Sequence, residues 1–104
     1  MLCTAPDSDA TEEMVRTLVN EGVVACGNIV ADVNSIYRWK GNLEAAAEAL
    51  IIFKTTEASW PRLKQRLPEL HPYDVPELLL LKVADGLASY LKWVEESTAV
   101  PDQA

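Results

Sequence analysis

Thiol and imidazole groups are scarce in this 104-residue sequence, which has two cysteines and one histidine. Cys3 and Cys26 are far apart, and neither forms a Cys-x-x-Cys pair or a close cluster with His71. This spacing argues against a structural zinc site. Two cysteines also fall short of the disulfide framework of small secreted domains, so we expect both thiols to be reduced.

Long apolar runs are also missing. No stretch of about 20 consecutive apolar residues occurs, so the sequence predicts no membrane-spanning helix. The first residues do not join a basic segment to an apolar one, so we expect no signal peptide and a cytoplasmic location. The length predicts a single domain over residues 1–104.

Basic residues are outnumbered. Nine lysines and arginines against sixteen acidic residues give a net charge of −7. Nucleic acids and anionic membranes bind basic surfaces, so this charge argues against both partners. An acidic surface suits cationic partners, and solubility explains it equally well.

Common catalytic motifs are absent from the sequence. It contains no GxSxG, HExxH, P-loop or Rossmann fingerprint. We therefore predict that the protein is not an enzyme. A catalytic pair of Cys26 and His71 would require these side chains to be adjacent in the fold, and an enzyme with its site at a subunit interface is a further alternative.

The stretch from Val23 to Thr56 reads as two long strands joined at Lys40-Gly41-Asn42-Leu43, with side chains alternating at a period of two. A strand of about 13 residues spans roughly 44 Å. A compact domain of this length has a radius of gyration of about 13 Å. The tip of the hairpin should therefore extend beyond the body, where its edge needs partners. We predict an oligomer built by edge-strand pairing.

The remaining elements follow from apolar spacing and from the positions of glycine and proline. We expect strands near residues 1–5, 28–40, 43–56 and 76–84, helices over 9–21, from Ser59 to about Leu67 and over 87–97, and a loose tail over 101–104. Pro68 should end or kink the second helix. This order predicts an α+β fold, a ferredoxin-like split β-α-β sandwich with an overlong hairpin and an extra C-terminal helix. One face of the sheet should remain bare, which favours self-association.

Several segments resemble the CutA family of divalent-cation tolerance proteins: LCTAPD, ACGNIVADVNSIYRWKGNLE, ALIIFKTT, HPYDVPELLLL and YLKWVEES. The match covers nearly the whole chain in the family's order. The resemblance implies a ferredoxin-like protomer, a tight PII-like homotrimer and a cytoplasmic role linked to copper and other divalent cations.

The sequence departs from the family pattern at three places. Only Met1 precedes Leu2, where members usually carry three or more residues, which puts the first strand in doubt. Ala31-Asp32 replaces a usual Pro-Gly. The acidic run after the hairpin tip is reduced to Glu44 and Glu48, which would weaken a cation site that depended on it.

Copper is the metal that the ligand inventory suits, because thiols and imidazole bind soft or borderline metals. The candidate ligands are Cys26, with Cys3 and His71 as secondary candidates; the resemblance adds weight to the two cysteines. Their spacing gives no local chelate, so we expect no preformed cage. Packing of Cys26 in the core and a solvated loop position for His71 are the alternatives.

The two most distinctive segments, SIYRWKG and HPYDVPE, contain aromatic and acidic residues. We predict a ligand pocket at a subunit interface, formed by Tyr37, Trp39, Glu48, Tyr73 and Glu77. Packing between subunits is the alternative, because Tyr and Trp are common interface anchors.

Two functions remain in competition. The first is a trimeric, metal-binding protein of divalent-cation tolerance. The second is a PII-like trimeric sensor or scaffold that binds a small molecule and responds to metals indirectly.

Overall fold

The computed structural model describes residues 1–98, which form three helices and a three-stranded antiparallel sheet. The elements are β1 (Leu2–Pro6), α1 (Asp9–Asn20), β2 (Cys26–Trp39), β3 (Asn42–Lys54), α2 (Trp60–Leu70) and α3 (Ala88–Ser97). The predicted tail over 101–104 lies outside the described residues. The predicted α+β class, the long hairpin and the additional C-terminal helix are confirmed.

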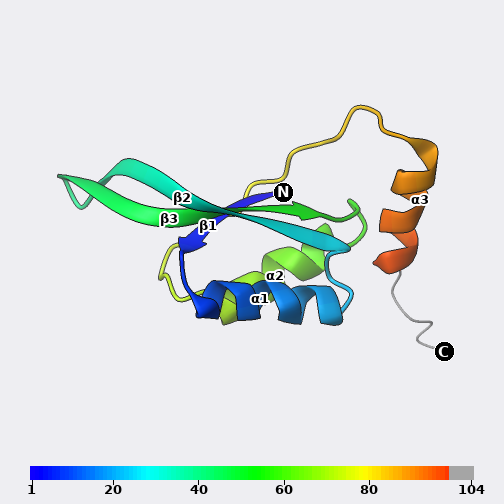
Figure 1. The fold of residues 1–104 in the computed structure, drawn as a ribbon, viewed down its shortest axis with the longest axis horizontal. Coiled ribbons are helices and arrows are strands. Elements are labelled where there is room, and N and C mark those ends of the chain that lie inside the picture. The colour runs from blue at the N-terminus through cyan, green and yellow to red at the C-terminus, as the bar shows by residue number, and fades with distance from the viewer. Residues whose placement is uncertain (99–104) are drawn as a thin grey trace.

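The sheet has the order β1-β3-β2, with β3 in the centre. Helices α1 and α2 lie side by side on one face of it, and α3 lies beyond the end of the sheet, away from the hairpin tip (Figure 1). The core lies between the sheet and the two helices. Its most buried side chains include Leu18, Ile51, Phe53, Leu63 and Leu67.

The hairpin of β2 and β3 extends well beyond β1 and the helices, as predicted (Figure 1). The molecule measures 49 × 30 × 24 Å, and its radius of gyration is 14.8 Å. Trp39 pairs with Asn42, so the turn consists of Lys40 and Gly41, both at positive φ. A two-residue turn of this kind follows the twist of the strands.

A bulge interrupts the pairing of β2 with β3 between Val30 and Val33. Within it, Asp32 adopts a φ of 62°. Positive φ is costly for residues with a Cβ, and Asp tolerates it better than most. The Ala31-Asp32 departure from the family pattern therefore falls where the backbone would favour glycine.

The predicted fourth strand over 76–84 is wrong. Within residues 1–98 this segment makes only one bridge, between Leu79 and Leu2, which exchange two hydrogen bonds of 2.9 Å. In that antiparallel register Glu77 faces Thr4, but the Thr4 carbonyl is already bound by His71. Leu80 faces Met1, so the residues after it have no opposing strand in this chain. Leu81 and Val83 are accordingly exposed rather than buried.

Two helix ends also differ from expectation. Ser8, rather than Asp9, is the N-cap of α1. Helix α2 continues through Pro68 to Leu70, although we expected a kink or an end near Leu67. The missing N–H of Pro68 frees only the carbonyl of Lys64, which is exposed and open to solvent. Gly22, with a φ of 71°, follows α1 as predicted.

No helix in the part of the chain from residue 1 to residue 98 has the length and apolar character needed to cross a membrane.

Candidate functional site

A cleft of about 690 Å³ lies between β2, β3 and the segment that follows α2. We call it the aromatic cleft. Its lining residues are Thr4, Ser35, Ile36, Tyr37, Trp39, Glu48, Pro72, Tyr73, Asp74, Val75 and Glu77. Its volume falls in the range of small-molecule sites, which is about 300–1,000 Å³.

Strand register explains why distant residues meet here. Thr4 is paired opposite Leu50, and Ser35 is opposite Ala46, which places them on the same face of the sheet as Glu48. The alternate β3 residues, Ala49, Ile51 and Phe53, are buried in the core instead. The aromatic cleft therefore lies on the sheet face opposite the core.

The central polar contact joins Tyr73 and Glu48. The Tyr73 hydroxyl donates to Glu48 Oε2 at 2.8 Å, which links the loop after α2 to β3. Glu48 is only 6% exposed. Burial, with the hydrogen bond to the Glu48 carboxylate, raises the pKa of Tyr73 to about 12. Tyr73 therefore remains a neutral hydrogen-bond donor over the physiological pH range.

His71 anchors the same loop. Its Nε2 lies 2.8 Å from the Thr4 carbonyl, and its Nδ1 accepts the backbone N–H of Tyr73 at 3.1 Å. A carbonyl only accepts, so Nε2 carries the proton and the ring is a neutral tautomer. The ring also packs against Tyr73, with centroids 4.8 Å apart. His71 is 6% exposed, so our expectation of a solvated loop position was wrong.

All five predicted pocket residues line the aromatic cleft: Tyr37, Trp39, Glu48, Tyr73 and Glu77. A single chain already brings them together, and their position at a subunit interface stays a prediction. The sequence analysis missed Ser35 and Asp74. The alternation of β2 could have indicated Ser35, which is two residues before Tyr37. Asp74 directly follows Tyr73 and could have been included on that ground.

The two thiols have different environments. Cys3 is fully buried in β1, and burial, with the Glu77 and Glu48 carboxylates nearby, raises the pKa of its thiol to about 12. Metals bind the thiolate, so Cys3 is a poor ligand in this state. Cys26 is partly exposed at the start of β2, where its sulfur lies 3.8 Å from Asn28 Oδ1.

The three candidate metal ligands do not meet within one chain. Cys3 pairs opposite Ile51 and Cys26 opposite Lys54, on the two outer strands, so they point to opposite faces of the sheet. Two strand spacings and three residues separate their Cα atoms by about 14 Å. Both ring nitrogens of His71 are already engaged. Across residues 1–98, no three His, Cys, Asp or Glu side chains are placed to hold one metal ion.

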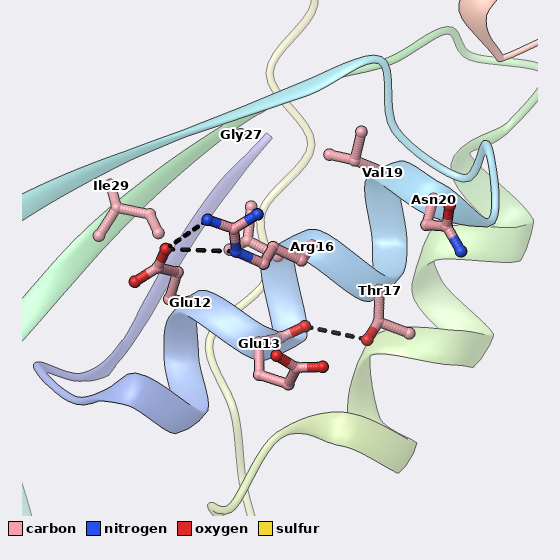
Figure 2. Close-up of a pocket in the computed structure, with 9 residues that line it drawn as sticks. Glu12, Glu13, Arg16, Thr17, Val19, Asn20, Gly27 and Ile29 are labelled. Carbon is pink, nitrogen blue, oxygen red and sulfur yellow. Dashed lines mark hydrogen bonds and ion pairs between the residues drawn. The ribbon is translucent and has the colours of Figure 1, made fainter.

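A second hollow, of about 590 Å³, lies between α1 and the beginning of β2. Figure 2 shows its floor, where Arg16 forms an exposed ion pair with Glu12 at 2.9 Å beside Ile29. Exposed pairs one helical turn apart contribute little binding or stability. The arrangement offers no buried polar group for a ligand, and we do not treat it as the site.

The fold and the aromatic cleft define a small α+β protein with a long hairpin of the PII-like kind. A solved structure of the PII-like protein CutA from Nostoc sp. PCC 7120 in apo form is similar, with a TM-score of 0.87 and 38% identity over 93% of each chain. That of the divalent cation tolerance protein (Cut A1) from Thermus thermophilus has a TM-score of 0.90 and 42% identity over 94% of this chain and 95% of that chain.

The family model of the CutA1 divalent ion tolerance protein matches residues 1–97. A divalent-cation tolerance protein CutA from Pyrococcus horikoshii is 42% identical over 91% of this chain and 92% of its own length. The chain belongs to the CutA1 divalent ion tolerance protein family. The resemblance seen in the sequence is thereby confirmed.

Proposed function

We propose that the protein acts in divalent-metal tolerance as a cytoplasmic homotrimer that binds copper without catalysing a reaction. Family membership supports the role in metal tolerance. The metal, the trimer and the location are our extension of it. The observation that carries the copper proposal is the partly exposed Cys26 thiol, which is accessible to a soft metal while Cys3 is not.

Cys26 alone makes an incomplete site. Further ligands would come from a second copy of the chain, or from Cys3 and His71 after the loop that follows α2 has moved. Cysteine binds copper as the thiolate, so affinity should fall as the pH is lowered and protons compete for the sulfur. The engaged nitrogens of His71 also argue against a Cys26–His71 catalytic pair.

The trimer proposal rests on uncovered apolar surface. Leu43 near the hairpin tip is 74% exposed, and Ile36 of β2 is 66% exposed. On the connection to α3, Val83 and Leu87 are both exposed as well. Apolar area of this extent favours burial between subunits. Edge strands of the overhanging hairpin supply backbone groups for the pairing. Sedimentation equilibrium should give three chains per particle, and a monomer at all concentrations would contradict the proposal.

Copper titration of the assembled protein tests the metal proposal. Cys26→Ser should weaken Cu(I) binding, measured against a competing chelator, while the exposed variant Glu57→Gln should bind as the wild type does. Each variant must first be shown to keep the oligomeric state. Unchanged copper stoichiometry and affinity in Cys26→Ser would remove Cys26 from the site.

A second function is favoured by the aromatic cleft. A PII-like sensor would bind a small molecule there, and the solved relative from Nostoc is described as PII-like. The cleft has the volume and the mixed polar and aromatic lining of such sites. Calorimetric titration with nucleotides and with metal salts separates the two functions, because only the sensor requires an organic ligand.

A further inference from the structure

The aromatic cleft has a lining suited to positive charge. Three aromatic side chains (Tyr37, Trp39 and Tyr73) and three carboxylates (Glu48, Asp74 and Glu77) contribute to its wall. No lysine, arginine or histidine is among the residues that line it. The rings present π faces, which attract cations, and the carboxylates are not neutralised by basic neighbours in the wall.

The carboxylates of the cleft are too widely spread for a bare metal ion. Divalent cations require several oxygen ligands at about 2.0–2.6 Å. Within the described residues, no three acidic, histidine or cysteine groups are placed to hold a metal. A volume of about 690 Å³ instead fits an organic molecule. The charge that the cleft selects is therefore carried by a larger cation.

Glu48 provides an independent observation. Its side chain is buried, and its Oε2 is fixed by the Tyr73 hydroxyl. Its Oε1 accepts no hydrogen bond from any residue between 1 and 98, and no salt bridge reaches it there. A buried carboxylate without a cationic partner is costly, and a bound cation would remove that cost.

Trp39 already accepts a cation within the chain. The ammonium of Lys40 lies 5.9 Å from the centroid of its ring. This distance is within the range of a cation–π contact. Lys40 does not itself line the cleft, so the contact leaves the lining without a basic group.

We propose that the aromatic cleft binds a small organic ammonium ion, held by Trp39, Tyr37 and Tyr73 as an aromatic cage and by the Glu48 carboxylate as counter-charge. This inference rests on the second proposed function, a small-molecule site in the cleft, and names the class of its ligand. The net charge of −7 would add long-range attraction for cations. Copper bound at Cys26 would be a separate event.

The experiment uses choline chloride and its neutral carbon isostere, 3,3-dimethyl-1-butanol, titrated calorimetrically into the assembled protein at constant ionic strength. The two probes have nearly the same shape and differ in charge. A desolvated cation–π contact and the Glu48 carboxylate together should make choline bind at least about 10-fold more tightly. Equal affinities would overturn the inference while leaving a small-molecule site in the cleft.

Two variants and two matched controls locate the binding. Trp39→Leu removes a ring, and Glu48→Gln removes the charge while keeping an oxygen acceptor for Tyr73. Both should weaken choline binding about 10-fold or more without affecting 3,3-dimethyl-1-butanol to the same degree. Trp93→Leu and Glu57→Gln, which lie outside the lining, should bind choline as the wild type does.

Circular dichroism and sedimentation of each variant show that fold and assembly are retained. Choline binding that is unchanged in both Trp39→Leu and Glu48→Gln would overturn the inference. So would the absence of choline binding to the wild type, whereas nucleotide titration would still test the small-molecule function separately.

Discussion

His71 Nε2 lies 2.8 Å from the Thr4 carbonyl, and this contact occupies the position where the next hydrogen bond of a fourth strand would form. His71→Ala should lower the free energy of unfolding by about 2–3 kcal/mol, because it leaves the Thr4 carbonyl and the Tyr73 N–H without partners. Urea denaturation at fixed protein concentration measures the loss. A stability equal to that of Glu57→Gln would contradict this role.

The two cysteines should differ in reactivity. Cys26 is partly exposed, whereas Cys3 is buried and its thiol pKa is raised to about 12. A thiol reagent at neutral pH should label one site rapidly in the native protein and the second only after unfolding. Cys26→Ser should lose the rapid phase. Equal labelling of both sites in the native protein would show that β1 opens readily.

The Tyr73–Glu48 contact predicts a loss of stability in alkali. The pKa of Tyr73 is raised from 10.0 to about 12 in the folded chain, so the neutral form is favoured by folding. This contribution is complete below pH 10 and is lost as the pH rises towards 12. Tyr73→Phe should therefore show a shallower fall in stability across that window. Identical slopes for Tyr73→Phe and wild type would refute the prediction.

Asp32 in the bulge of β2 predicts a stabilising substitution. Its φ of 62° is a conformation that glycine adopts without a steric cost. Asp32→Gly should raise the free energy of unfolding by up to about 1 kcal/mol. Ala31→Gly is the matched control, because residue 31 is not at positive φ and should lose stability instead. Thermal unfolding of the two variants checks the contrast.

Gly27 at the start of β2 is held by packing. A Cβ at this position would lie 2.6 Å from Val15 Cγ1 and 3.3 Å from Phe53 Cδ1. Gly27→Ala should destabilise the protein by about 1–3 kcal/mol, because α1 must move away from the sheet. At Gly86 the nearest atom is the end of the Leu91 side chain, at 3.0 Å, so Gly86→Ala should cost less. Denaturant midpoints for the two variants measure the difference.

Periodicity predicted the elements that form through local patterns. The alternation in β2 and β3 gave the hairpin, and the same alternation placed Tyr37 and Trp39 together on the wall of the cleft. Helices α1 and α3 followed from apolar spacing close to their observed bounds.

Features that depend on tertiary partners could not be predicted in this way. An apolar run such as 78–83 indicates a strand only if an opposing edge is available, and the sequence does not reveal that His71 occupies that edge. The burial of His71 depends on a contact with Thr4, which is distant in sequence. The positive φ of Asp32 arises from the register shift between strands, which no local propensity encodes.

The turn at Lys40 and Gly41 also bears on the order of folding. From the Trp39–Asn42 pair outward, each further pair of the hairpin closes only a slightly longer loop, so β2 and β3 can zip together from the tip. β1 must instead find β3 across most of the chain, as the Leu2–Ile52 pair shows. The part of the molecule that protrudes furthest can thus form before a core exists, and neighbouring chains can meet paired strands while their own helices are still docking.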